Sequence, residues 1–350
     1  MDTSAANPQD LPLLLTMGDP AGIGPEIVLK AVAARPALRD RVLVAGDVGT
    51  LRRAAQALDA VQLPAPALAG VDSLQAWKRR PASSLAVVQA CQVLDPVVPG
   101  QVQAAAGRAA ADCIRWAARA VLRGQGSALV TAPIHKEALA AAGEPYPGHT
   151  EMLQALAAEH LGVGSEVLPV RMMLSCPGLR TVLVSIHVSL RQALEAVTTD
   201  NILQTLHITA AHFARCGLPG VRIAVAGLNP HAGEGGLFGR EEIDHIAPAV
   251  RTAQAQGLQV SGPHAPDTVF MRARQGEFDV VIAMYHDQGL IPVKLMGLAD
   301  GVNTTLGLPM VRTSPDHGTA FDLAGSGRAD PSSLLAAIDA ALDMTGTDRS

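Results

Sequence analysis

Residues 13–34 read LLLTMGDPAGIGPEIVLKAVAA, and this stretch alone points to an α/β fold. The apolar run Leu13–Thr16 predicts a buried strand. A loop rich in glycine follows it, and Pro25, in a first helical turn, begins a helix that we expect to run to Ala34. A strand, a tight turn and a helix are the repeating unit of α/β proteins.

The same alternation of short apolar runs and longer helical patterns continues along the chain, which predicts largely parallel or mixed sheets. The predicted strands are Leu13–Thr16, Val42–Ala45, Leu85–Gln89, Ala128–Thr131, Val170–Leu174, Thr181–Ile186, Val221–Ala226 and Asp279–Met284. The predicted helices include Pro25–Ala34, Ala104–Arg123, Glu151–His160, Asn201–Cys216, Glu241–Gln256 and Pro331–Thr345. The Pro- and Ala-rich stretch from Val61 to Pro99 has no sustained helical period, so we expect a surface excursion there.

The composition describes a globular protein large enough for two α/β domains. Of 350 residues, 48% are hydrophobic and 17% charged, which excludes a disordered chain. The formal net charge of −5 predicts no general attraction to nucleic acid or to anionic membranes. Aromatic residues make up only 3%, which argues against a stacking platform for single-stranded nucleic acid.

Cysteine use and the first residues indicate a cytoplasmic protein. The four cysteines are far apart and form no CxxC pair, so we expect reduced thiols at Cys91, Cys113, Cys176 and Cys216. The opening MDTSAANPQD has no basic residue, and the apolar stretch Leu11–Leu15 is too short for a signal segment or a membrane span.

The loop after the first predicted strand contains three glycines, Gly18, Gly22 and Gly24. A helix N-terminus behind such a loop is able to face an anion. The loop matches neither the G-x-G-x-x-G fingerprint nor the P-loop pattern. Ligand binding and a plain tight turn are therefore equal alternatives here.

A second polar cluster follows the predicted strand Ala128–Thr131: it comprises Thr131–Lys136 and then Pro147–Glu151. Thr150, before an apolar helical run, is able to act as a helix N-cap. His149 stands at the same helix start, where a cation is disfavoured and an anionic ligand is favoured. We therefore expect His149 to contact a ligand.

Three histidines, His187, His231 and His286, each follow a predicted strand directly or within a few residues. Strand ends converge at one edge of a sheet in α/β proteins, and three imidazoles suit a divalent cation with an open position. Any one such histidine is more often a hydrogen-bonded loop residue, and the spacing alone leaves that alternative open.

Further cationic and polar residues follow towards the C-terminus, namely Lys294, Asn303, Arg312, Thr313, Ser314, Asp316 and His317. Lys294 and Arg312 stand in apolar sequence surroundings, where a charge needs a partner. A carboxylate or phosphate on a ligand is the expected partner. An internal ion pair with Asp287 or Asp316 is the alternative.

Seven motifs together resemble the 4-hydroxythreonine-4-phosphate dehydrogenase (PdxA) family of vitamin B6 biosynthesis. They are GDPAGIGPE (Gly18–Glu26), TAPIHK (Thr131–Lys136), PGHTE (Pro147–Glu151), GLNPHAGEGGLFGREE (Gly227–Glu242), MYHDQGLIPVK (Met284–Lys294), GVNTTLGLP (Gly301–Pro309) and RTSPDHGTAFDLAG (Arg312–Gly325). The resemblance runs from about Leu13 to Asp343 and rests on long, specific motifs.

The resemblance implies two α/β/α domains around a cleft, as in isocitrate and isopropylmalate dehydrogenases. We place the first domain at residues 1–146 plus 288–350 and the second at residues 147–287. It also implies a homodimer, with the active site in the cleft and at the dimer interface, and NAD bound without a Rossmann fingerprint. The residues that bind the cofactor are not predicted.

The family's site residues carry over by motif. The divalent-metal ligands fall on His187, His231 and His286, and the substrate contacts fall on His149, Thr150, Lys294, Asn303 and Arg312. Asp267 matches an acidic residue near the substrate, and the base that removes the hydroxyl proton is Lys294, Asp267 or water on the metal. The family usually has Thr-His-x-Pro-Leu where this chain has Ile186-His-Val-Ser-Leu190, so we expect a different local backbone there.

The reaction that the resemblance implies is NAD-dependent oxidation of 4-phosphooxy-L-threonine to a 3-keto acid. That acid decarboxylates to 3-amino-2-oxopropyl phosphate, in pyridoxal phosphate synthesis. NADP is the alternative cofactor, and we expect one divalent metal ion per active site: Zn, Mg or Co. A cation would stabilise the developing alkoxide and then the enolate, while basic residues hold the phosphate and the carboxylate.

Three alternatives remain at this point. A paralogous dehydrogenase of 4-phospho-D-threonate, or of a related phosphorylated hydroxy acid, is compatible with the altered segment Ile186–Leu190. A non-catalytic protein that senses a phosphorylated metabolite would use the same cationic residues. A phosphate acyl- or acetyltransferase would have a related α/β architecture.

Overall fold

Strand β1 (Leu13–Thr16) lies in the middle of a parallel sheet, between β2 (Val42–Gly46) and β5 (Leu129–Thr131). The side chains of Leu13, Leu14 and Leu15 are at most 1% exposed. Because successive side chains of a strand point to opposite faces, both faces of this sheet are covered.

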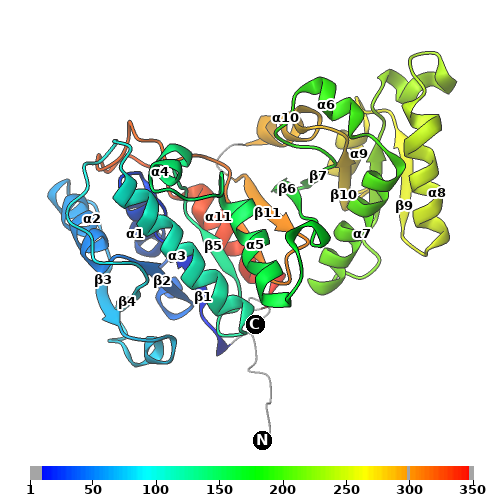
Figure 1. Cartoon of the computed structure of the whole chain (residues 1–350). Helices are drawn as coiled ribbons and strands as arrows, with labels where there is room; N and C mark the ends of the chain where they lie inside the picture. Colours follow the sequence, from blue (N-terminus) through cyan, green and yellow to red (C-terminus); the bar gives the residue numbers. More distant parts are fainter. Residues whose placement is uncertain (1–9, 298–299, 347–350) are drawn as a thin grey trace, which may run out of the picture. The chain divides into compact units, whose positions relative to one another are not determined.

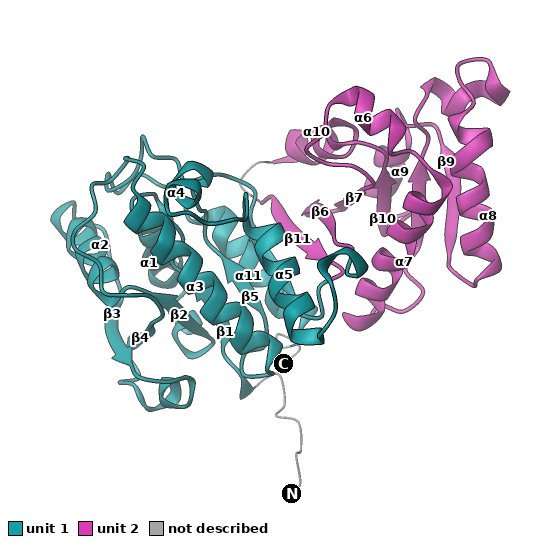
Figure 2. Ribbon diagram, viewed as in Figure 1, with its two compact units in different colours: residues 1–168, 308–350 teal, residues 169–307 magenta. Residues whose placement is uncertain are grey.

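The structure is a computed structural model that describes residues 10–297 and 300–346. It divides into two compact units (Figures 1 and 2). Unit 1 comprises residues 1–168 and 308–350, and unit 2 comprises residues 169–307. The predicted α/β fold class is confirmed.

The sheet of unit 1 has the strand order β3-β4-β2-β1-β5-β12, and each of its neighbouring pairs is parallel. Its other strands are β3 (Ala67–Val71), β4 (Ser84–Gln89) and β12 (Arg312–Pro315). Its helices are α1 (Gly24–Ala34), α2 (Val48–Ala60), α3 (Ala104–Leu122), α4 (Lys136–Ala141), α5 (His149–Leu161) and α11 (Ser332–Met344). Short 3-10 segments are Pro36–Asp40, Leu74–Arg79 and Ser165–Val167.

The sheet of unit 2 has the strand order β11-β6-β7-β10-β8-β9. Strands β7, β10, β8 and β9 are parallel, whereas β6 is antiparallel to both β7 and β11. The strands are β6 (Arg171–Cys176), β7 (Leu179–Leu183), β8 (Ile223–Ala226), β9 (Val260–His264), β10 (Val280–Ala283) and β11 (Val302–Leu306). The helices are α6 (Leu190–Glu195), α7 (Thr199–Arg215), α8 (Ala247–Ala255), α9 (Val269–Arg274) and α10 (His286–Met296). A π-helical turn, Glu242–Ile246, precedes α8.

Unit 2 is one continuous segment whose two ends meet. Strand β6 begins it and β11 ends it, and these strands pair with Arg171 opposite Leu306. A Cβ atom on Gly307 would lie 2.4 Å from the carbonyl oxygen of Pro169, and Gly307 has a φ of +90°. Only glycine allows so close an approach of the two backbones.

The chain passes between the units later than the predicted points, which lie after residues 146 and 287. The reason is packing: α5 packs on α3 within unit 1, and α10 packs on β6, β7 and β10 within unit 2. The stretch Val61–Pro99, expected as a surface excursion, contains β3, which pairs with β4 and ends the sheet of unit 1. Within the described residues, no helix is both long enough and apolar enough to cross a membrane.

Candidate active site

The three predicted histidines follow three neighbouring parallel strands of unit 2. His187 follows β7, His286 follows β10 and His231 follows β8, and β10 lies between the other two strands. All three therefore belong to the carboxyl edge of one sheet, as expected for a site in an α/β protein. We call this the histidine edge.

His286 contacts both a neighbouring carboxylate and a second predicted ligand. Its Nδ1 atom lies 2.7 Å from Oδ1 of Asp287, and its ring centroid lies 5.8 Å from that of His187. A carboxylate at Nδ1 fixes the tautomer with the proton there, which leaves Nε2 as a lone-pair donor. This is the arrangement in which a histidine binds a metal ion.

His231 stands in a left-handed turn. The φ angles of His231, Ala232, Gly233 and Glu234 are 52°, 53°, 80° and 43°. Residues with a Cβ atom rarely adopt this conformation, so the turn needs outside support.

The support comes from Glu242, whose side chain is buried. Its Oε1 accepts the N–H groups of Leu228 and Asn229, each at 2.7 Å, and its Oε2 accepts Nδ2 of Asn229 at 3.0 Å. A Cβ atom on Gly233 would lie 2.7 Å from Oε2 of Glu242. A buried carboxylate that accepts these bonds therefore holds the loop that carries His231.

The histidine edge fits a divalent cation in its donor chemistry and in its strand placement. Three neutral imidazoles are a common ligand set for a metal with an open position. Among residues 10–297 and 300–346, however, no three metal-ligating side chains are close enough together to hold an ion. The metal site stays a prediction.

A cavity of about 700 Å³ opens at the histidine edge. Its lining includes His231, Asp267, Tyr285 and Gln288. The cavity thus brings Asp267, predicted near the substrate, beside one predicted metal ligand. Neither Lys294, which is exposed on α10, nor Asn303, which is half-buried in β11, lines this cavity.

Unit 1 carries Arg312, His149 and Thr150; Arg312 is the first residue of β12, and its guanidinium reaches Thr131, the last residue of β5. Arg312 is 3% exposed and donates from Nη2 to Oγ1 of Thr131 at 2.7 Å. Burial lowers the pKa of Arg312 to about 10, so its guanidinium is charged at neutral pH. The sequence predicted that a buried charge at Arg312 and Lys294 needs an anionic partner. That reasoning holds for Arg312, which is buried, but not for Lys294, which is exposed.

His149 begins α5, and Gly148 takes the cap position, so Thr150 lies in the first turn and is not the N-cap. The Nε2 atom of His149 is buried, with no hydrogen-bond partner among the described residues. Burial, with the nearby charge of Arg312, holds the pKa of His149 well below its usual value. A neutral imidazole thus lies near a buried guanidinium. We call Arg312 and His149 together the arginine edge.

Sequence reasoning did not single out Asp19 and His135, which lie at the same end of unit 1. Asp19 is fully buried; its Oδ1 accepts the N–H of Ala21 at 2.8 Å, while Oδ2 has no hydrogen-bond partner within the described chain. Burial raises the pKa of Asp19. His135 stacks on Phe321 with ring centroids 4.5 Å apart. Both residues belong to family motifs named above, Gly18–Glu26 and Thr131–Lys136. Their position shortly after predicted strands is the sequence feature that could have identified them as site residues.

The glycine loop after β1 is explained by close packing. A Cβ atom on Gly24 would lie 2.2 Å from the carbonyl oxygen of Met17, and one on Gly18 would lie 2.6 Å from that of Pro133. The tight-turn alternative therefore accounts for these glycines. A cavity of about 230 Å³, lined by Gly22, Arg53 and others, lies beside the loop.

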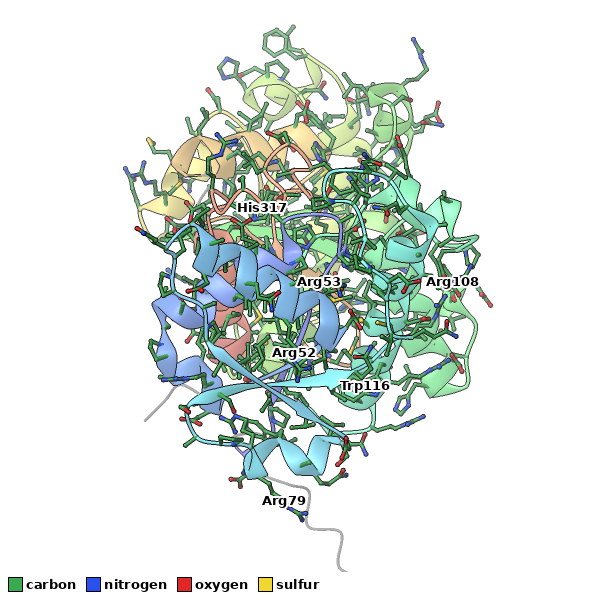
Figure 3. The ribbon with its side chains drawn as sticks, turned by 90° about the vertical axis from the view of Figure 1, so that its left-hand side faces the viewer. Arg52, Arg53, Arg79, Arg108, Trp116 and His317 are labelled. Carbon is green, nitrogen blue, oxygen red and sulfur yellow. The ribbon has the colours of Figure 1, made fainter. Side chains whose placement is uncertain are left out.

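Figure 3 shows the face of unit 1 that carries α2 and α3, with Arg53 and His317 labelled. His317 is exposed, and its Nδ1 lies 3.0 Å from the carbonyl oxygen of Gly318. Arg53 donates to Oγ1 of Thr50 at 2.9 Å. Both side chains have local partners, and neither belongs to the arginine edge.

The altered segment after His187 has a local structural role. Ser189 caps α6: its Oγ accepts the N–H of Gln192 at 3.3 Å, and Oε1 of Gln192 accepts the N–H of Ser189 at 3.1 Å. A proline at this position would have no N–H for the second bond. The serine thus gives α6 a capping box directly after a predicted metal ligand.

A protein-family model described as pyridoxal phosphate biosynthetic protein PdxA matches residues 38–341. The chain belongs to this family. Membership makes it an oxidoreductase, and a dehydrogenase of this kind uses a nicotinamide cofactor. The family predicted from the sequence motifs is confirmed.

Relatives within the PdxA family carry two names. The chain is 50% identical over 338 residues to a 4-hydroxythreonine-4-phosphate dehydrogenase of Beijerinckia indica, covering 94% of each chain. It is 42% identical to a D-threonate 4-phosphate dehydrogenase of Pectobacterium atrosepticum, over 95% of this chain and 98% of the relative. The crystal structure of a 4-hydroxythreonine-4-phosphate dehydrogenase from Klebsiella pneumoniae matches with a TM-score of 0.82 at 43% identity, over 96% and 98% of the two chains.

Proposed function

We propose that this PdxA-family chain oxidises 4-phosphooxy-L-threonine with NAD⁺, assisted by a divalent metal ion, in pyridoxal phosphate synthesis. The 3-keto acid product loses CO₂ to give 3-amino-2-oxopropyl phosphate. The observation that carries the proposal is the placement of His187, His286 and His231 on three neighbouring parallel strand ends. The 50% identity to a relative with this activity in its name supports the choice of substrate.

The three histidines would hold the metal ion. When bound, the cation would stabilise negative charge on the substrate oxygen as the alcohol is oxidised. Asp287, hydrogen-bonded to Nδ1 of His286, keeps Nε2 of that ring available as a ligand.

The arginine edge would bind the anionic groups of the substrate, with Thr150, Lys294 and Asn303 as further contacts. Arg312 offers a planar, charged donor, and neutral His149 adds a hydrogen bond without adding charge. Fixing the phosphate and the carboxylate orients the C–H bond towards the nicotinamide. The hydride leaves to NAD⁺, and the hydroxyl proton passes to a base.

Asp267 is the proposed base, with Lys294 as the alternative. Asp267 lines the same cavity as His231, one of the predicted metal ligands. Lys294 does not line that cavity.

A second candidate is the oxidation of 4-phospho-D-threonate. It is favoured by the relatives named D-threonate 4-phosphate dehydrogenase at 42% identity, and by Ser189 in place of the family's proline. The two substrates share the phosphate and differ in the groups around the oxidised carbon, so the same cationic residues serve both.

One assay separates the candidates: NADH formation with each substrate, with EDTA and with added Zn²⁺, Mg²⁺ or Co²⁺. Metal-dependent turnover of 4-phosphooxy-L-threonine is expected. Turnover of 4-phospho-D-threonate alone assigns the chain to the second candidate. Turnover that survives complete metal removal contradicts the metal proposal.

We also propose that the protein is a homodimer that forms through the histidine-edge side of unit 2. Leu237 and Leu295 are 73% and 83% exposed, and they lie in segments that follow β8 and β10. A contact between two copies of the chain that covers these side chains would remove their apolar surface from water. We expect Leu295→Lys to shift the protein from dimer to monomer in light scattering, whereas Val93→Lys, a 79% exposed site in unit 1, leaves the dimer intact.

A further inference from the structure

Gln288 links two of the histidine-bearing strand ends. It is half-buried in the first turn of α10, two residues after His286. Its Oε1 accepts the N–H of Met284 at 2.7 Å, and its Nε2 donates to the carbonyl oxygen of Gly227, also at 2.7 Å. Met284 directly follows β10, and Gly227 begins the loop that carries His231. One side-chain amide therefore bridges both loops.

Only a primary amide of this length makes both bonds. A backbone N–H needs an acceptor and a backbone carbonyl needs a donor, so the two partners fix the orientation of the Gln288 amide. A glutamate would place an acceptor against the carbonyl oxygen of Gly227. An asparagine is one methylene shorter and does not span the same distance.

The bridge extends to the neighbouring strands through backbone groups. Oγ of Ser185, at the end of β7, donates to the carbonyl oxygen of Met284 at 2.9 Å. The N–H of Gly227 donates to the carbonyl oxygen of His264, at the end of β9, at 2.7 Å. The ends of β7, β10, β8 and β9 are thus joined in one chain of hydrogen bonds, with Gln288 as its central side chain.

We propose that Gln288 is a positioning residue for the predicted metal site: it sets the separation between the loop of His286 and the loop of His231. The inference rests on the proposed function for the presence of the metal. Side chains that orient metal ligands without touching the ion typically contribute 10–100-fold to metal affinity. Gln288 acts on two ligands at once, through the backbone that carries them.

The test is Gln288→Glu, with Gln254→Glu as the matched control. Gln254 is also in unit 2, and its Nε2 donates to a backbone carbonyl, that of Val260, at 2.8 Å, but Val260 is at the amino end of β9. Both variants thus replace one amide donor to a carbonyl with a carboxylate. Co²⁺ titration of the full-length protein, followed by calorimetry and by the absorption spectrum of the bound ion, gives the dissociation constant.

We expect Gln288→Glu to weaken Co²⁺ binding by about 10–100-fold, while Gln254→Glu retains the wild-type constant. Equal constants for Gln288→Glu and wild type, or equal losses in both variants, overturn the proposal. A general loss of stability would appear in both variants, and unfolding curves record it separately.

Hydrogen exchange of the metal-free protein tests the bridge without any metal. Gln288→Glu should speed exchange in peptides that cover residues 227–236 and 284–288, and Gln254→Glu should not. Unchanged exchange there overturns the bridge itself. If wild type and His231→Ala bind Co²⁺ equally, the proposed metal site fails, and the exchange result still decides whether Gln288 joins the two loops.

Discussion

The two units place chemically different groups near strand ends of their sheets. The histidine edge of unit 2 follows the carboxyl ends of β7, β10 and β8, whereas in unit 1 the Arg312 guanidinium reaches Thr131, the last residue of β5. His286 is partly exposed and pairs with an exposed carboxylate, whereas Arg312 is 3% exposed. Burial separates them: an accessible imidazole is able to bind a cation, and a buried guanidinium attracts an anion. A substitution at the histidine edge should therefore affect metal binding, and a substitution at the arginine edge should affect substrate binding.

The largest effect is expected from His231→Ala. Removing one of three metal ligands should lower metal-dependent NADH formation by more than about 100-fold, beyond the usual effect of a residue that only orients a ligand. The fold should persist, because His231 is in a loop that Glu242 holds. Steady-state kinetics and circular dichroism check both points. A folded variant with wild-type turnover would remove the metal assignment.

Arg312→Lys should damage the other edge and leave metal binding intact. Loss of planar, charged hydrogen bonds costs about 1.5–3 kcal/mol, so KM for the phosphorylated substrate should rise roughly 10–100-fold. The Co²⁺ dissociation constant should not change. Arg80→Lys is the matched control, since the Arg80 side chain is 4% exposed in unit 1 and bonds to Asp40. Comparable changes in KM and in metal affinity would contradict the separation of the two edges.

Acid should destabilise unit 2 through His212, a buried residue of α7 outside the histidine edge. Burial, with the charge of Arg215, lowers the pKa of His212 to about 4 from 6.5. Between these values the unfolded chain binds a proton that the folded chain does not, so stability falls as pH falls, by about 3 kcal/mol over the window.

His212→Leu should therefore lose less stability between pH 7 and pH 5 than the wild type, as measured by urea unfolding. Its kinetic constants at neutral pH should match those of the wild type. An unchanged pH dependence would mean that other groups govern acid sensitivity.

The smallest effect is expected from Asp19→Asn, in the loop after β1 of unit 1. Burial raises the pKa of Asp19, so at neutral pH its ionised form weakens the fold, and the amide should increase the free energy of unfolding by about 0.5–2 kcal/mol. The bond from the N–H of Ala21 to Oδ1 is available to asparagine as well. Higher stability with lower turnover would mark Asp19 as a functional residue, whereas lower stability would make it purely structural.

Much of the fold follows from apolar periodicity, and two of the exceptions share a cause. Strand β1 occupies its predicted residues, Leu13–Thr16, but β3, β9, β11 and β12 were not predicted. Buried polar side chains lie in β11 and β12: Thr304 and Thr313 are 0% exposed, and Oγ1 of Thr313 donates to a helix carbonyl at 2.7 Å. A pattern of apolar residues does not detect a strand whose buried side chains are polar.

The candidate site was predictable where a residue type alone indicates chemistry. Histidines at strand ends indicate metal binding in a linear sequence, and the strand order of unit 2 places them together. Gln288 carries no such signal, because its partner Gly227 is 61 residues away and offers only backbone atoms. Asp19 was missed for a related reason: its raised pKa depends on burial by distant segments.

The meeting ends of unit 2 have a consequence for how this protein changes over generations. Because Arg171 pairs opposite Leu306, residues 169–307 enter and leave the fold at a single point, and exchanging them closes no new long loop. The whole histidine edge, with Gln288 and Glu242, is therefore encoded by one continuous stretch of the gene. Recombination between relatives is able to exchange this stretch as a whole, while Arg312 and His149 are encoded outside it.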